Sequence, residues 1–248
     1  MRADGLLRAA VANNAGWCDV VCRSHGYPGE FTARTWISPR HDLPFYPNAI
    51  TLGPDATTAD TQAARDPDRA YAVKDSFALL DLAPEGLAPL FDAEWVAWDP
   101  APQEQPPVAG LRWQAVSGAA ELARWEAAWA GDGDAAGLFR PDLLADPCCA
   151  ILGCHRDGAL AGGAIAYTTA GVTGISNVFR TGLPGEVPSP GSLSPATLWR
   201  SAVPAVAALR PGLPVVGYEH GEDLAAARAA GGRVHGPLRV WTRGSALP

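Results

Sequence analysis

The chain has 248 residues, a formal net charge of −7 and a hydrophobic content of 48%. This content is enough to build a packed core and excludes an intrinsically disordered chain. The acidic balance, without any run of basic residues, argues against nucleic-acid binding, because contacts to phosphates need clustered lysines and arginines.

No apolar stretch has the length of a membrane span, and residues 1–16 lack the apolar segment of a signal peptide. We therefore expect a cytoplasmic protein that makes no contact with a membrane. The five cysteines are expected to be thiols rather than disulfides, since the cytosol is reducing.

Residues 4–24 have apolar residues at helical spacing and predict a helix, which the Asn-Asn-Ala-Gly stretch at 13–16 is expected to break into two. Cys18, Cys22 and His25 fall on one face of the second part. Thiolates and imidazole are good zinc ligands, but three ligands on one continuous helical face rarely converge on one ion. We expect the two thiols to pack in the core, with no metal bound.

Short strands are predicted in the rest of the N-terminal half. Residues 32–38 and 49–52 each read as one strand, and residues 71–82 and 90–98 as further strands or short helices. These segments are separated by proline- and glycine-containing turns, which suit a sheet with short connections.

A proline-rich stretch at residues 99–110 predicts an extended linker. We therefore divide the chain near residue 105. The predicted parts are an N-terminal half, residues 1–105, and a C-terminal half, residues 106–248.

Three apolar runs, at residues 149–152, 160–167 and 172–179, form the most informative stretch. Asp157-Gly158 separates the first two runs and suits a tight hairpin turn, because both residues tolerate a positive φ. Ala170-Gly171 makes the second reversal. We predict three consecutive antiparallel strands, covered on both faces by helices because the runs are apolar nearly throughout.

Helices and strands alternate around these three strands. Ser194-Pro195 is a strong helix start, since serine supplies a capping oxygen and proline lacks only an N–H that would be unpaired there. The other predicted elements are a strand at 111–116, a helix at 119–130, a broken helical stretch at 134–145, a helix at 196–208, a strand at 213–218, a helix at 222–230 and a strand at 234–241.

This order of elements resembles the GNAT (N-acetyltransferase) superfamily over residues 111–243. DGALAGGAIAY is similar to the family's hairpin between its second and third strands, ISNVF to its fourth strand, and LPVVGYEHGEDLAAARAAGG to its fifth strand and the next helix. The resemblance implies an α/β (α+β) fold, with a mixed, mainly antiparallel sheet flanked by helices and an N-terminal strand–helix half joined to it. WCDVVCRSHG and FYPNAITL also resemble segments that precede the GNAT region in uncharacterised actinobacterial GNAT-like proteins.

In that family the fourth strand leads into a loop that binds the pyrophosphate of CoA at a helix N-terminus, where free N–H groups and the helix dipole favour anions. The resemblance thus implies acetyl-CoA or another acyl-CoA as co-substrate. Here the strand continues as Arg-Thr-Gly-Leu-Pro-Gly, whose first glycine comes one place earlier than in the family and whose proline removes an N–H. The cofactor-binding residues that the resemblance implies are Asn177, Val178, Phe179, Arg180, Gly182 and Gly185.

Acyl transfer to an amine requires a group that accepts a proton and donors that polarise the carbonyl. In the family these groups lie at the ends of the fourth and fifth strands, which here points to Tyr218 and Glu219. Tyr218 is predicted as the general acid for the leaving thiolate, and Glu219 as the general base if burial raises its pKa. In the alternative interpretation Tyr218 is a rim residue and Glu219 is solvated or pairs with an arginine.

Four charged residues of the N-terminal half are predicted to bind the acceptor. They include the chain's single lysine, which lies beside an aspartate in a strand-like segment. Neighbours on a strand face opposite ways, so we do not expect these two to pair directly. The four residues are Lys74, Asp75, Asp92 and Glu94.

We expect a GNAT-type acyltransferase that moves an acyl group from a thioester donor, acyl-CoA, to a small-molecule amine. In one alternative the donor is an aminoacyl-tRNA, which would make tRNA the only nucleic-acid partner. In the other, the protein is a GNAT-fold module without CoA binding or catalysis that binds a small ligand.

Overall fold

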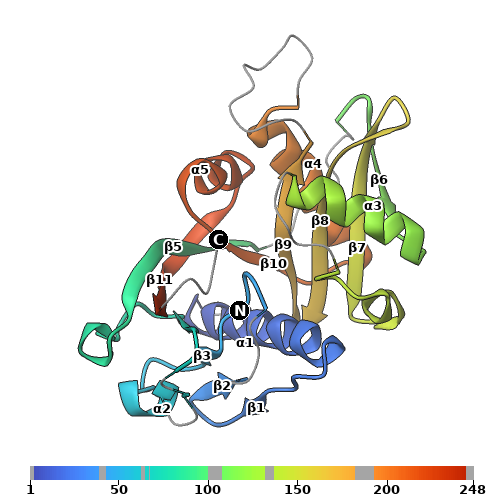
Figure 1. Ribbon diagram of the computed structural model, residues 1–248. Coiled ribbons are helices and arrows are strands. Elements are labelled where there is room, and N and C mark those ends of the chain that lie inside the picture. The colour runs from blue at the N-terminus through green and yellow to red at the C-terminus, as the bar shows by residue number, and fades with distance from the viewer. Residues whose placement is uncertain are drawn as a thin grey trace. The chain divides into compact units, whose positions relative to one another are not determined.

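The computed structural model describes residues 3–38, 43–62, 65–66, 68–99, 108–131, 137–181 and 193–243. The chain divides into two compact units (Figure 1). The first consists of residues 1–95 and 235–248, and the second of residues 96–234. The predicted division at residue 105 differs from this in two places. Residues 96–98, at the end of an N-terminal strand, belong to the second unit, and residues 235–243 of the C-terminal strand belong to the first.

The first unit is built around strand β4, which pairs in parallel with β3 and antiparallel with β11. Strands β2 and β1 continue the sheet on the side of β3, and β5 lies beside β11. Its elements are α1 (Ala3–Ser24), β1 (Glu30–Phe31), β2 (Thr35–Ile37), β3 (Ala49–Thr51), α2 (Thr58–Gln62), β4 (Tyr71–Asp75), η1 (Ala83–Glu85), β5 (Ala88–Trp98) and β11 (Arg233–Arg243), of which β5 and β11 also give residues to the second unit.

Helix α1 is continuous, and the predicted break at residues 13–16 is wrong. Asn13 and Ala15 are buried, and the Oδ1 atom of Asn14 accepts a hydrogen bond from Nζ of Lys74 at 2.8 Å. Packing and this bond outweigh the poor helix propensity of asparagine and glycine, which is only about 1 kcal/mol per residue.

The second unit contains the sheet order β10-β9-β8-β7-β6, with the end of β5 beside β10. Strands β6 to β9 are antiparallel neighbours, and β10 joins β9 in parallel. The predicted run of three antiparallel strands is confirmed. The elements are β6 (Leu111–Ala115), α3 (Ala119–Ala130), η2 (Pro141–Ala145), β7 (Cys149–Arg156), β8 (Ala159–Thr169), β9 (Val172–Arg180), α4 (Pro195–Leu209), β10 (Val215–Glu219) and α5 (Gly221–Ala229).

Helices cover both faces of this sheet, as predicted (Figure 1). On one face, Val215, Ile175 and Leu152 join a core with residues of α4 and α5. On the other face, Trp125 of α3 packs edge-on against Phe179 of β9, with ring centroids 5.0 Å apart. The sheet is therefore mixed, mainly antiparallel and flanked by helices, which is the predicted fold class.

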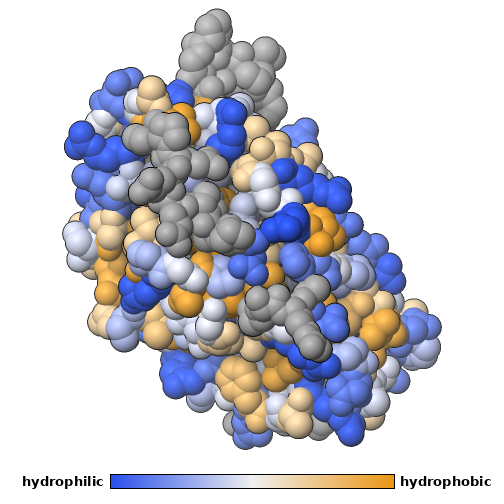
Figure 2. All heavy atoms as spheres, turned by 180° about the vertical axis from the view of Figure 1, so that it is seen from behind, coloured by the Kyte–Doolittle hydropathy of each residue, from blue (hydrophilic) through white to orange (hydrophobic). Residues whose placement is uncertain are grey.

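Polar side chains are spread among apolar ones on the face drawn in Figure 2, as expected for a surface in contact with water. None of the helices in the described ranges is both long and apolar enough to cross a bilayer.

Candidate functional site

A β-bulge interrupts the pairing of β8 with β9. Ile165 pairs with Ser176, but Gly163 pairs with Phe179, so two residues of β9, Asn177 and Val178, lie opposite one residue of β8. Asn177 has a φ of 51°, in the left-handed region that asparagine tolerates better than most residues. A bulge bends its strand and leaves the extra residue outside the ladder of hydrogen bonds. It therefore frees backbone groups of β9 at the carboxyl half of the strand.

Strand β10 ends next to this bulge. Its parallel register with β9 is regular at Val215 with Thr173 and at Val216 with Gly174. A Cβ atom built on Gly217 would lie only 2.9 Å from the carbonyl oxygen of Ile175, so glycine allows the two backbones to approach closely there. Tyr218 and Glu219 follow and end the strand.

Glu219 is a predicted catalytic residue whose pKa is shifted by its surroundings. It is half-buried, and burial raises the pKa of its carboxyl well above its usual range, with a smaller contribution from the negative charge of Asp223. Within the described residues, no donor forms a hydrogen bond with the carboxyl group of Glu219. Such a carboxylate is a stronger base than a solvated one.

Tyr218 and Glu219 project to opposite faces of β10, because they are neighbours in a strand. Glu219 shares its face with Val215, which packs against α4 and α5. Tyr218 lies on the other face, to which Ser176 and Phe179 also belong. The two predicted catalytic groups therefore approach the strand end from opposite faces of the sheet.

The helix that follows β9 begins close to the end of that strand. A Cβ atom built on Gly162 would lie 3.3 Å from both the Cα of Arg180 and the Cδ1 of Leu198, a residue in the first turn of α4. Ser194 caps this helix, and its Oγ accepts a hydrogen bond from the N–H of Thr197 at 3.2 Å, as the Ser-Pro motif predicts. The backbone of the exposed residue Arg180 and the first turn of α4, the positive end of a helix dipole, are thus near one another.

The predicted cofactor-binding residues are only partly described. Gly182 and Gly185 lie outside the described residues. Val178 packs against the core that contains Leu198, and Phe179 packs on Trp125, so these two offer a ligand mainly their backbone groups. The Nδ2 atom of Asn177 is 3.0 Å from the Oγ of Ser176.

Comparison with known proteins identifies the fold. No family model matches the chain, and no curated protein matches it. Several solved structures match the chain. A GCN5-related N-acetyltransferase from Kribbella flavida is 16% identical, with a TM-score of 0.63 over 96% of both chains. A GNAT-family acetyltransferase from Novosphingobium aromaticivorans is 14% identical, with a TM-score of 0.55 over 91% of this chain and 94% of that one. A conserved protein of unknown function from Staphylococcus epidermidis is 12% identical, with a TM-score of 0.56 over 92% and 98%.

The chain has the GNAT fold. The likeness covers nearly the whole chain, including the N-terminal half, where the sequence offered only short segments that resemble GNAT-like proteins. At these identities the comparison concerns the fold and leaves the reaction open.

In the first unit of this GNAT fold, Lys74 and Asp75 serve as internal anchors. Both are buried, and they face opposite ways, as the strand register predicted. Lys74 binds Asn14 of α1, while Asp75 accepts hydrogen bonds from the backbone N–H groups of Leu80 at 2.7 Å and Phe77 at 3.3 Å. Burial raises the pKa of the Asp75 carboxyl, and these bonds partly oppose the effect. Their role in binding the acceptor amine stays a prediction.

Asp92 and Glu94 share one face of β5. Arg239 of β11 donates two hydrogen bonds to Asp92, at 2.6 and 3.1 Å, and this lowers the pKa of Asp92. Arg239 could not be found from the sequence, because no local pattern links residues 147 positions apart. The Oε2 atom of Glu94 is buried and has no hydrogen-bond partner in the described part of the chain. A role of these two carboxylates in acceptor binding also stays a prediction.

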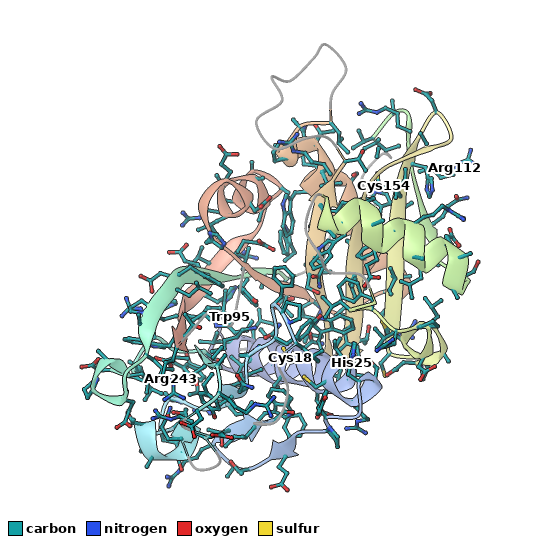
Figure 3. All side chains as sticks on the ribbon, in the orientation of Figure 1. Cys18, His25, Trp95, Arg112, Cys154 and Arg243 are labelled. Carbon is teal, nitrogen blue, oxygen red and sulfur yellow. The ribbon has the colours of Figure 1, made fainter. Side chains whose placement is uncertain are left out.

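The cysteines of α1 pack in the core of the first unit. Cys18 and Cys22 are buried, and burial raises the pKa of both thiols, which makes them unreactive. Cys18 and His25 are labelled on and just after α1 in Figure 3, and Cys154 lies in the second unit. Across the described ranges, no three or more His, Cys, Asp or Glu side chains are grouped so as to hold a metal ion.

Proposed function

We propose that this GNAT-fold protein transfers an acyl group from acyl-CoA to a small-molecule amine, with Glu219 as the general base. The observation that carries the proposal is a carboxyl group with a raised pKa at the carboxyl end of β10, beside the bulge of β9. A general base works best when its pKa lies near the operating pH, and an ordinary solvated glutamate, at about 4.3, is too acidic for this task.

The residues around the end of β9 fit the anionic part of CoA. Arg180 is exposed and can bind a phosphate, and the adjacent N-terminus of α4 favours negative charge. The thioester supplies the activated carbonyl, and N–H groups freed by the bulge can polarise its oxygen.

In the proposed reaction the amine nitrogen forms a bond to the thioester carbonyl carbon, and the bond from that carbon to sulfur breaks. The proton leaves the amine for the carboxylate of Glu219. Tyr218 can protonate the departing thiolate. Since the two side chains project to opposite faces of β10, the carbonyl is best placed between the ends of β9 and β10, where both faces are within reach.

Acyl-CoA binding is tested first, by calorimetric titration of the full chain with acetyl-CoA and with free CoA. Dissociation constants in the micromolar range, about −8 kcal/mol, support the proposal. Absence of binding up to millimolar concentrations contradicts it and favours another donor, such as an aminoacyl-tRNA, or a non-catalytic role.

The base is tested by thiol release from acetyl-CoA with a panel of amines. We expect Glu219→Gln to lower kcat by about 100-fold or more. In the wild type, kcat should fall as the pH drops through the raised pKa of Glu219, because the protonated acid cannot accept a proton; the variant should lack this limb. Glu222→Gln, an exposed neighbour on α5, is the matched control. Equal rates for the two variants would contradict the assignment.

A further inference from the structure

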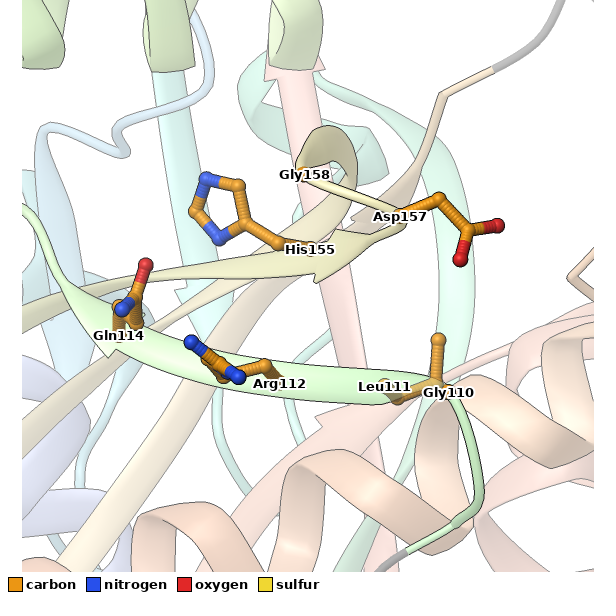
Figure 4. Close-up of a pocket in the computed structure, with 7 residues that line it drawn as sticks. All are labelled: Gly110, Leu111, Arg112, Gln114, His155, Asp157 and Gly158. Atoms are coloured by element: carbon orange, nitrogen blue, oxygen red, sulfur yellow. The ribbon is translucent and has the colours of Figure 1, made fainter.

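A hollow lies in the second unit, at the outer edge of the sheet (Figure 4). It has a volume of about 440 Å³ and is formed by β6, β7 and the Asp157-Gly158 turn. In the sheet order, β8 separates β7 from the bulged strand β9 and from β10. The hollow is therefore distinct from the proposed acyl-transfer site.

Three polar side chains converge on one face of this hollow. Arg112 of β6 pairs with His155 of β7, and Gln114 pairs with Gly153, so register and alternation place all three polar side chains on the same face. Figure 4 shows Arg112 and Gln114 on β6 and His155 on the neighbouring strand β7, while the carboxylate of Asp157 points away from the imidazole.

Gly153 makes room for the imidazole. A Cβ atom built on Gly153 would lie 2.9 Å from Cε1 of His155 and 3.2 Å from Cδ1 of Leu160. The ring therefore lies over the glycine, and any larger residue there would displace it. The position of His155 depends on this one residue of β7.

These side chains have unused hydrogen-bonding capacity. Nδ1 of His155 is buried and has no hydrogen-bond partner in the described part of the chain. An unpaired buried N–H is more costly than an unpaired lone pair, so the proton of the neutral ring belongs on Nε2. Within the described ranges, no acceptor binds the guanidinium of Arg112 or the amide of Gln114. The part of the hollow around His155 is thus lined by hydrogen-bond donors and one positive charge, and the carboxylate of Asp157 lines another part.

We propose that this hollow binds a small molecule through an oxyanion, a carboxylate or a phosphoryl group, held by Arg112, Gln114 and Nε2–H of His155. Guanidinium groups bind such oxygens with strong, directional hydrogen bonds. The hollow falls in the range of about 300–1,000 Å³ that small-molecule sites occupy, so it has room for more than a bare ion. The carboxylate of Asp157 at the far side disfavours a second anionic group there.

The test is an NMR titration of the isotope-labelled full chain with inorganic phosphate and, separately, with acetate, at constant ionic strength. We expect saturable shifts of the His155 ring and the Gln114 side-chain amide. Saturation by phosphate alone identifies a phosphoryl group as the preferred ligand, and saturation by acetate alone a carboxylate. Shifts that never saturate with either probe overturn the proposal.

Variants separate a built site from general charge attraction. Arg112→Gln should weaken binding by about tenfold or more, and Gly153→Ala should weaken it similarly by displacing the imidazole. Arg124→Gln, which removes another exposed arginine of the same unit, should leave binding unchanged. Equal weakening by Arg112→Gln and Arg124→Gln would overturn the proposal. Arg112 is exposed, so its variant keeps the test valid even if Gly153→Ala fails to fold.

Discussion

Asp75 in the first unit and Glu219 in the second are both shielded carboxyl groups whose pKa is raised by burial. They differ in their hydrogen bonds. Asp75 accepts hydrogen bonds from two backbone N–H groups of the turn that follows β4, whereas no donor within the described residues reaches Glu219. The comparison shows that a raised pKa does not by itself mark a catalytic group. Unused hydrogen-bonding capacity at a strand end is the more informative sign.

The largest change in stability is expected when Asp75 is replaced. Asp75→Ala should lower the free energy of unfolding by about 3 kcal/mol, because it removes a buried carboxyl group and leaves the partly buried N–H groups of Leu80 and Phe77 without acceptors. Urea denaturation of the full chain measures it. Asp81→Ala removes an exposed aspartate that also accepts a backbone hydrogen bond, from Ala83, and should cost less than about 1 kcal/mol. A similar loss of stability for both variants would mean that the hydrogen bonds of Asp75 stabilise the fold no more than those of an exposed aspartate.

Replacing Glu219 should change the free energy of unfolding in the opposite direction and make the protein more stable. Because its pKa is higher in the folded state than in the unfolded state, the protonated group favours folding. This contribution is present below the unfolded pKa, about 4.3, and is lost as the pH rises through the folded-state pKa. Glu219→Gln keeps a neutral group at every pH. The variant should therefore match the wild type near pH 4 and exceed its stability at pH 8 by the order of 1 kcal/mol.

Urea denaturation at the two pH values tests this expectation, with Glu222→Gln as the exposed control. A wild type that is as stable as Glu219→Gln at pH 8 would mean that Glu219 is ionised at little cost, and the comparison with Asp75 would fail.

The smallest effect is expected for a carboxylate that is paired but exposed. Arg239 binds Asp92 with two hydrogen bonds, yet 65% of the Asp92 side chain is exposed. A double-mutant cycle with Asp92→Asn and Arg239→Gln should give a coupling below about 1 kcal/mol that decreases further in high salt. A larger, salt-independent coupling would show that the pair is shielded in solution.

Much of the second unit could be predicted because its signals are local. The Asp157-Gly158 and Ala170-Gly171 turns define the three antiparallel strands, and Ser194 with Pro195 defines the start of α4. Turns and caps depend on the φ preferences and hydrogen bonds of adjacent residues, which the sequence contains directly.

The first unit was harder to predict, and α1 shows why. The Asn-Asn-Ala-Gly stretch at 13–16 has low helix propensity, yet burial of Asn13 and the bond from Lys74 to Asn14 keep the helix continuous. Both effects come from residues far along the chain. The same holds for the pairing of Arg239 with Asp92.

The sequence by itself determined the order of strands and helices over residues 111–243, the GNAT fold and the position of Tyr218 and Glu219 at a strand end. Only the tertiary structure decided that the C-terminal strand pairs with β4 in the first unit, and that Asp75 is satisfied while Glu219 is not. The reason is physical: strand order follows from local turns and periodicity, whereas burial and hydrogen-bond partners depend on contacts between distant segments.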